Sequence, residues 1–244
     1  IHFIVASAQM AGDMDTALTE ARRLRTVLDP ETSAKIAWIQ VIDAAPYQAL
    51  AQFAEPRAIL SAPAPDARLP YAVAMRHYAR AVAYARLRDQ RGFDRELEAL
   101  TALKTSDAFA DMIAQGVPAP DLLTLAEAVA RGRLATARGR HLEAADHYRR
   151  AAEIEATLPY QEPPYWYYPV NQSLGAALYQ AGRPAEAAVA FRYALAQTPN
   201  NGWALYGLAR SEAAQGHADE TATAEASLRA AWRGDRRWLR MDRL

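Results

Sequence analysis

Apolar residues recur along almost the whole chain at the three- and four-residue spacing of amphipathic helices, and no stretch keeps the strict alternation of a strand. Turn-forming segments that contain Gly, Pro or Asp separate the helical stretches. The pattern predicts helices at residues 2–11, 14–28, 33–53, 56–61, 70–91, 93–105, 107–115, 119–138, 141–157, 168–181, 184–198, 202–215 and 218–232. The sequence therefore predicts an all-α protein.

Glycines in the predicted turns indicate an internal repeat. Gly182 and Gly216 are 34 residues apart, and each lies between two predicted helices. Aligning the chain on these two glycines and on two further turn glycines, Gly92 and Gly139, places a small residue seven positions before each: Ala85, Gly132, Gly175 and Ala209. Nine positions after the middle two stand aromatic residues, Tyr148 and Phe191. This spacing predicts helical hairpins whose two helices approach closely.

These residues resemble the tetratricopeptide-repeat (TPR) family, most clearly over 168–201 and 125–157 and more weakly over 70–105 and 202–235. The resemblance implies a right-handed α-solenoid of about six antiparallel helix hairpins. Residues 1–69 are predicted to form a degenerate helical-hairpin region. Residues 70–244 would form TPR-like repeats with a Pro/aromatic insert at 158–169 and a C-terminal capping helix.

The insert interrupts the period. Gly139 and Gly182 are 43 residues apart, so about nine residues are added to the 34-residue repeat. The sequence "LPYQEPPYWYYPVNQ" (158–172) is rich in Pro and aromatic residues. It could plug the space between two hairpins or form an exposed binding loop. We favour the plug, because a large exposed aromatic patch is unusual unless something binds it.

The amino-acid composition argues against several classes of function. The chain has no Cys, which excludes disulfides and thiolate chemistry and leaves the compartment open, with the cytoplasm as the default expectation. The 28 basic and 28 acidic residues balance, so no overall charge favours nucleic acid. No apolar run has the length of a membrane span. No phosphate-binding loop, nucleophile elbow or zinc-binding helix motif is present, and we predict neither a catalytic site nor a cofactor.

A row of arginines suggests a binding surface. Arg86, Arg133 and Arg210 stand six residues before three of the aligned glycines. The TPR resemblance implies that this part of each first helix lines a concave groove, where the neighbouring positions hold Gln172, Tyr179, Trp203 and Tyr206. Guanidinium groups suit carboxylates, so we expect a peptide or partner protein, preferably acidic, in this groove. The alternative is that these arginines are simply solvated.

Histidines support a second function hypothesis. The segments "IHFIVASAQMAGD" and "MRHYARAVAYARL" resemble parts of a group of bacterial TPR-like proteins with a His-rich first half. The chain begins with Ile rather than Met, which is consistent with a piece of a longer protein. His2 and His77 are then weak candidates for metal ligands, although zinc requires three or four. The alternative function is therefore the C-terminal part of a metal-binding or enzymatic protein. A self-assembling structural unit is a third possibility.

Overall fold

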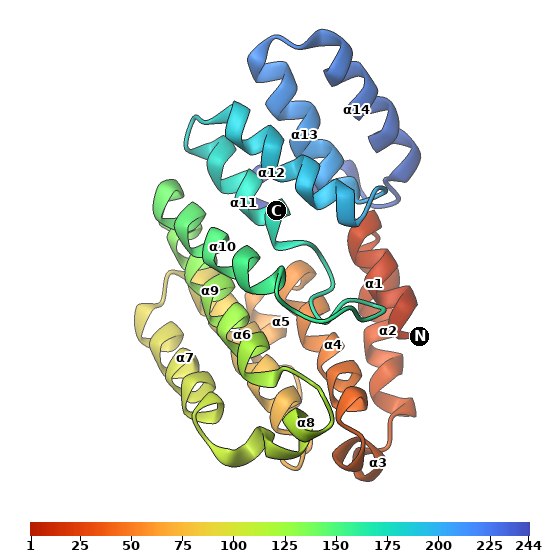
Figure 1. Cartoon of the computed structure of the whole chain (residues 1–244), viewed down its shortest axis with the longest axis vertical. Coiled ribbons are helices and arrows are strands. Elements are labelled where there is room, and N and C mark those ends of the chain that lie inside the picture. The colour runs from red at the N-terminus through yellow and green to blue at the C-terminus, as the bar shows by residue number, and fades with distance from the viewer.

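The computed structural model describes residues 1–244 and contains fourteen α-helices, three short 3-10 helices and no strand (Figure 1). The α-helices are α1 (His2–Ala11), α2 (Met14–Val27), α3 (Pro30–Lys35), α4 (Ala37–Phe53), α5 (Pro56–Leu60), α6 (Pro70–Leu87), α7 (Gln90–Lys104), α8 (Ala110–Ala114), α9 (Ala119–Ala137), α10 (His141–Glu155), α11 (Val170–Gln180), α12 (Pro184–Gln197), α13 (Gly202–Gln215) and α14 (Ala218–Ala231). The 3-10 helices are η1 (Asp107–Phe109), η2 (Arg236–Trp238) and η3 (Met241–Arg243).

One type of tight turn recurs in five antiparallel hairpins, α1–α2, α6–α7, α9–α10, α11–α12 and α13–α14. In every one of these turns a residue with positive φ stands two positions before the second helix: Gly12, Arg88, Gly139, Gly182 and Gly216, with φ between 58° and 79°. Such left-handed residues end helices, and glycine adopts the conformation without steric cost. Helix α4 and the short α5 stand between the first two hairpins and pack against α2 and α6. The predicted TPR-like solenoid is confirmed.

The alignment on Gly92 is wrong. Gly92 lies in the first turn of α7, and Arg88 takes the left-handed turn position with φ 58°. Asp89 then caps α7, because its carboxylate accepts a hydrogen bond from the Gly92 N–H at 3.0 Å. The register of this hairpin therefore moves by four residues. Val82, and not Arg86, is the position equivalent to Arg133.

The other predicted helices are present, with boundaries that shift by a few residues. The predicted helix 33–53 is divided at Ile36, whose extended backbone (φ −121°, ψ 102°) separates α3 from α4. Helix α3 begins before residue 33 because Asp29 caps it and Pro30 occupies its first turn. The predicted helix 107–115 begins as the 3-10 helix η1 and continues as α8.

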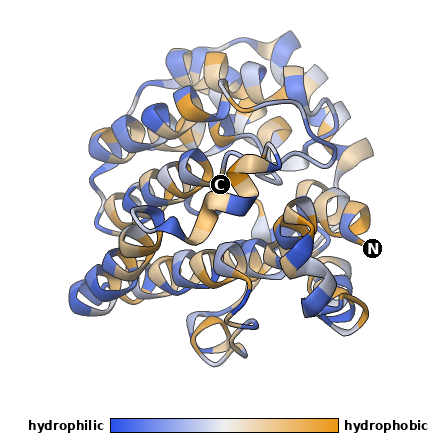
Figure 2. Cartoon of the chain, turned by 60° about the horizontal axis from the view of Figure 1, so that its bottom comes forward, coloured by the Kyte–Doolittle hydropathy of each residue, from blue (hydrophilic) through white to orange (hydrophobic).

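The core is rich in alanine and depends on close helix contacts. A continuous cluster of 57 buried residues extends from α1 to Leu244 and crosses residue 69, so the proposed domain boundary there stays a prediction. In two hairpins a glycine faces an aromatic ring: a Cβ atom on Gly132 would lie 2.5 Å from the Tyr148 ring, and one on Gly175 would lie 2.9 Å from Phe191. Figure 2 shows hydrophilic residues mainly on the outer turns of the helices.

The insert is a plug, as favoured from the sequence. Four of its five aromatic residues, Tyr165, Trp166, Tyr167 and Tyr168, are buried, and Tyr160 is exposed. The amide of Gln48 on α4 holds this segment at two points, donating to the Tyr165 carbonyl at 3.1 Å and accepting from the Tyr167 N–H at 3.2 Å. Trp166 packs edge-on against Tyr78 of α6, with ring centroids 5.1 Å apart. The insert thus fills the space between early and late hairpins.

The two ends of the hairpin array meet (Figure 1). The indole N–H of Trp203 on α13 donates to the Gln9 carbonyl of α1 at 2.8 Å, and the Arg233 N–H donates to the Ala11 carbonyl at 2.9 Å. After α14, residues 233–244, here called the closing segment, turn back to the middle of the molecule. Leu244 at its end is only 2 % exposed. None of the helices is both long enough and apolar enough to span a membrane.

Candidate functional site: an arginine-lined central cavity

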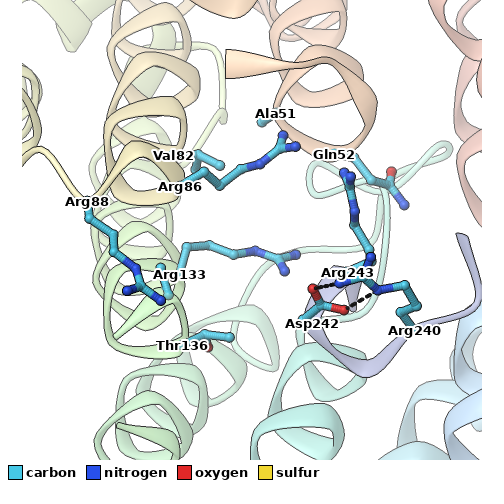
Figure 3. Close-up of a pocket in the computed structure, with 11 residues that line it drawn as sticks. Ala51, Gln52, Val82, Arg86, Arg88, Arg133, Thr136, Arg240, Asp242 and Arg243 are labelled. Atoms are coloured by element: carbon cyan, nitrogen blue, oxygen red, sulfur yellow. Dashed lines mark hydrogen bonds and ion pairs between the residues drawn. The ribbon is translucent and has the colours of Figure 1, made fainter. Parts of the chain in front are cut away.

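A cavity of about 380 Å³ lies between α4, α6, α9 and the closing segment. It is bordered by α6 and α9, which are the first helices of their hairpins. Five arginines and a single carboxylate line it: Arg86, Arg88, Arg133, Arg240, Arg243 and Asp242 (Figure 3). The cavity therefore carries a formal charge of about +4, although the whole chain is neutral.

Two of these arginines come from the helices and are held by backbone and hydroxyl groups. Arg86 on α6 donates from Nη1 to the Ala54 carbonyl at 2.6 Å. Arg133 on α9 donates from Nη1 to the backbone oxygen of Leu244. The other terminal nitrogen of Arg133 donates to the Tyr168 hydroxyl at 3.2 Å and to Ser173 Oγ at 3.4 Å. Arg133 thus connects α9 to the insert, to α11 and to the closing segment.

The closing segment supplies the other side of the cavity. Arg240 and Asp242 form a two-point ion pair, with distances of 2.9 and 2.6 Å, so the only carboxylate of the lining is already paired (Figure 3). Arg243 stacks over the Trp238 ring at 4.4 Å. Its Nη1 is buried and has no hydrogen-bond partner. A buried donor without a partner is costly, and an acceptor inside the cavity would remove that cost.

Repulsion between the guanidinium groups is incompletely compensated. Burial lowers the pKa of Arg86, and the positive charges of Arg243 and Arg133 lower it further. The Glu55 carboxylate, at 3.7 Å from both Arg86 and Arg243, acts in the opposite direction, but it is 70 % exposed and therefore well solvated. An anion inside the cavity would stabilise the charged form of these arginines. The lining therefore carries an excess of positive charge.

Residues 178–239 match the family model of the tetratricopeptide repeat. The matched segment contains α12, α13 and α14 with the end of α11, and it supports the resemblance derived from the sequence. Tetratricopeptide repeats are in general protein-interaction modules, and solenoids of this kind use their inner surface for binding. Comparisons with curated proteins and with solved structures gave no match.

The structure divides the predicted TPR groove residues into three groups. Arg86 and Arg133 line the central cavity. Arg210 and Tyr206 line a separate cavity of about 310 Å³ beside α14 and η2, and Tyr179 is half-buried. Trp203 and Gln172 are buried at about 1 % exposure, and Gln172 accepts a hydrogen bond from Asn201 at 2.9 Å. These two side chains pack between helices and offer no surface to a partner.

Three of the lining arginines were not predicted from the sequence: Arg88, Arg240 and Arg243. Arg88 was placed near the end of the predicted helix 70–91, although its neighbour Asp89 is a good helix cap. The other two lie beyond the predicted capping helix. The sequence does contain a signal that this segment packs against the rest of the protein. It includes the apolar residues Trp238, Leu239 and Leu244, which a fully solvated tail would not need.

The histidines form no metal centre. His77 Nδ1 contacts the Glu96 carboxylate at 2.7 Å, and Arg80 binds the other oxygen of Glu96 at 2.7 Å. His2 stacks on the neighbouring Phe3 ring at 4.7 Å. No group of three or more His, Asp or Glu side chains in residues 1–244 is arranged to hold a metal ion. The positions of His2 and His77 therefore give no support to a metal role.

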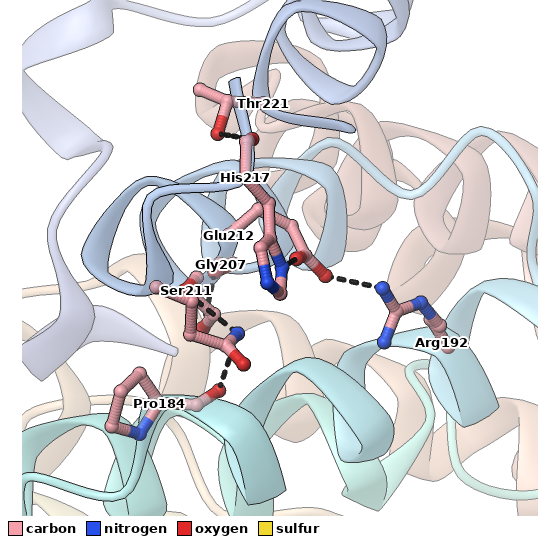
Figure 4. A network of polar contacts seen from close by, with 8 residues as sticks. Pro184, Arg192, Gly207, Ser211, Glu212, His217 and Thr221 are labelled. Atoms are coloured by element: carbon pink, nitrogen blue, oxygen red, sulfur yellow. Dashed lines mark hydrogen bonds and ion pairs between the residues drawn. The ribbon is translucent and has the colours of Figure 1, made fainter. Parts of the chain in front are cut away.

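A second polar cluster lies within the TPR segment (Figure 4). Glu212 on α13 is 1 % exposed, and its carboxylate contacts Arg192 of α12 and His217 Nδ1, the latter at 2.7 Å. Ser211 beside it donates to the Gly207 carbonyl at 2.8 Å. The buried carboxylate is thus fully engaged by partners from α12 and from the turn before α14. We interpret this cluster as a structural contact that stabilises the packing of these helices.

Proposed function

We propose that the chain is a non-catalytic interaction module that binds an acidic segment of a partner protein in the central cavity. The observation that carries the proposal is the set of five arginines around one small cavity whose only carboxylate is already paired. The tetratricopeptide match over 178–239 supports an interaction role in general. The acidic character of the partner comes from the charge of the cavity.

Carboxylates are the natural complement of these groups. Guanidinium forks bind carboxylates through two parallel hydrogen bonds, and each charge-assisted bond contributes about 1.5–3 kcal/mol when it is shielded from water. Arg243 Nη1 is a buried donor that lacks an acceptor. Arg88 is exposed at the mouth of the cavity and forms no ion pair. An incoming Glu or Asp side chain would meet Arg88 first and Arg243 deeper in the cavity.

A fluorescently labelled peptide of glutamates, titrated with the intact chain, tests the proposal. We expect binding that weakens as salt rises from about 50 to 300 mM, because screening reduces charge attraction at the cavity mouth. The substitution Arg88→Glu should weaken binding about five- to tenfold, corresponding to about 1 kcal/mol or slightly more for a partly exposed pair. Arg88 is suited to this test because its side chain supports no other part of the fold.

The matched control is Arg149→Glu. Arg149 lies on α10, is exposed and pairs with Asp146 at 2.6 Å, so the same charge change falls outside the cavity. It should leave affinity unchanged. Arg210→Glu shows whether the bound peptide extends to the second cavity beside α14. Equal losses for Arg88→Glu and Arg149→Glu would refute specific binding in the central cavity and leave only general attraction.

A further inference from the structure

A third cavity, distinct from the central one and from the cavity beside α14, has a charge opposite to that of the central cavity. It has a volume of about 520 Å³ and lies between α1, the end of α10, the end of α12 and the insert. Glu155 and Glu162 contribute its two carboxylates, and none of its lining residues is Arg, Lys or His. That is notable in a chain with 28 basic residues. The volume falls within the range of small-molecule sites. We call this space the aromatic cavity.

Most of the wall is apolar and aromatic. Phe3 and Met10 come from α1, and Tyr160, Tyr165 and Trp166 come from the insert. Tyr160 is 85 % exposed, while the indole N–H of Trp166 is buried without a hydrogen-bond partner. Aromatic faces attract cations through their ring quadrupoles. A mostly apolar wall with a few polar groups is the usual form of a ligand site.

Glu155 is the polar group that gives this cavity its specificity. It is the last residue of α10, where the helix dipole adds partial negative charge. One carboxylate oxygen accepts a hydrogen bond from the Val170 N–H at 2.9 Å, and no cation in the chain pairs with the group. Burial raises the pKa of the Glu155 carboxyl to about 8, although the Val170 hydrogen bond opposes this effect. The chain supplies no cation to pair with the ionised form of this group.

We propose that the aromatic cavity binds a small organic cation, an ammonium group on an apolar or aromatic body, with the Glu155 carboxylate as its counter-ion. The ammonium group would lie against Glu155 and the exposed aromatic rings, and its body would cover the apolar wall formed by α1 and the insert. Glu162 lies farther out, where the Tyr160 hydroxyl donates a hydrogen bond to it. It adds negative potential at the entrance.

Binding of such a cation is coupled to a proton. Below about pH 8 the Glu155 carboxyl is mostly protonated in the free chain, so binding must release its proton. The other titratable groups of the lining are Tyr160, Glu162 and Tyr165, all from the insert, while α1 and α12 contribute none. Affinity should therefore rise about tenfold between pH 6 and pH 7 and about twofold at most above pH 8.

Three probes of one shape test the site by calorimetry on the full chain: phenethylammonium, 2-phenylethanol and phenylacetate. At pH 8 we expect the ammonium to bind at least about tenfold more tightly than the alcohol, and the acetate most weakly. Below pH 7, binding of the ammonium should release close to one proton, which is measured by repeating the titration in buffers of different ionisation enthalpy.

The decisive variant is Glu155→Gln, which keeps an oxygen for the Val170 N–H and removes the charge. It should abolish the preference for the ammonium over the alcohol and the pH dependence. Glu153→Gln is the matched control, because Glu153 is exposed on the same helix and does not line the cavity. Equal affinities for the ammonium and the alcohol in the wild-type chain would overturn the proposal. So would an unchanged preference in Glu155→Gln, or binding of the ammonium without proton release.

Discussion

A single aromatic ring, that of Phe191, is enclosed by glycines from two helices. Gly175 of α11 approaches its edge, where an added Cβ atom would lie 2.9 Å from the ring. Gly207 of α13 approaches more closely, and a Cβ atom there would lie 2.1 Å from the ring. The contacts of this ring connect three consecutive helices, α11, α12 and α13. The two helices can approach the ring this closely because glycine has no side chain.

Alanine substitutions at these two glycines should therefore have different effects. Alanine is better than glycine inside a helix by about 1 kcal/mol. At Gly175 a small movement of the ring accommodates the methyl group, so Gly175→Ala should be nearly neutral. At Gly207 the overlap is larger, and overpacking should destabilise Gly207→Ala by about 1–3 kcal/mol. Chemical unfolding of both variants measures the difference, and equal free energies of unfolding would contradict the close approach of α13.

At the scale of elements, the insert is held by one amide side chain. Gln48 donates to the Tyr165 carbonyl and accepts from the Tyr167 N–H, and all of these groups are buried. Two backbone groups of the insert would lose their partner if this amide were replaced. A buried polar group without a partner costs about 1–3 kcal/mol. The position of the insert in the fold therefore depends on Gln48, which lies more than one hundred positions earlier in the sequence.

Gln48→Leu should lower the free energy of unfolding by about 2–4 kcal/mol, because it leaves a buried carbonyl and a buried N–H unpaired. The matched control is Gln40→Leu on the same helix. Gln40 is also buried, but its side-chain oxygen has no hydrogen-bond partner, so its replacement should be neutral or stabilising. Urea unfolding followed by tryptophan fluorescence compares the two. A similar loss in both variants would mean that the amide of Gln48 has no special role.

Most helices could be predicted from the sequence because their periodicity is local. The error at Gly92 arose because a glycine was assumed in every turn, whereas Arg88 adopts the left-handed conformation. Arg86 reaches the central cavity although it is not the repeat equivalent of Arg133; it lies one turn farther along its helix. Arg86 was thus correctly expected near Arg133, although the alignment on Gly92 that suggested it was wrong.

The remaining part of the site could not be predicted, because it depends on contacts between distant residues. The closing segment brings Arg240 and Arg243 beside α4 and α6, which are more than 150 residues earlier in the chain. Local sequence patterns do not indicate that the closing segment packs against these distant helices. The aromatic cavity is similar, since its wall combines Phe3 of α1 with residues of the insert that lie more than 150 positions later.

At the scale of the whole molecule, Trp232 joins the last hairpin to the first. Its ring lies edge-on to Trp203, with centroids 4.8 Å apart, and fills the space beside Gly12 and Gly202. Trp232→Ala should cost about 3–5 kcal/mol, as expected for a large buried aromatic residue. Hydrogen exchange should then accelerate in α1, although α1 is more than 200 residues away in sequence.

The control is Trp38→Ala, since Trp38 is half exposed on α4 and should not affect exchange in α1. In an open array of repeats, a change in the last hairpin destabilises its neighbours and leaves the first hairpin untouched. Unchanged exchange in α1 of Trp232→Ala would show that the contact between the two ends contributes little to stability.

The meeting of α1 with α13 also restricts how such a chain can evolve. An open solenoid grows by duplication of a hairpin, because a new unit needs to fit only its two neighbours. Here an additional hairpin would separate Trp203 from the Gln9 carbonyl and Trp232 from Gly12. It would also displace the closing segment from Arg133. These contacts therefore oppose the insertion of a hairpin between α1 and α13, and we expect change in this architecture to occur in its loops and cavity linings.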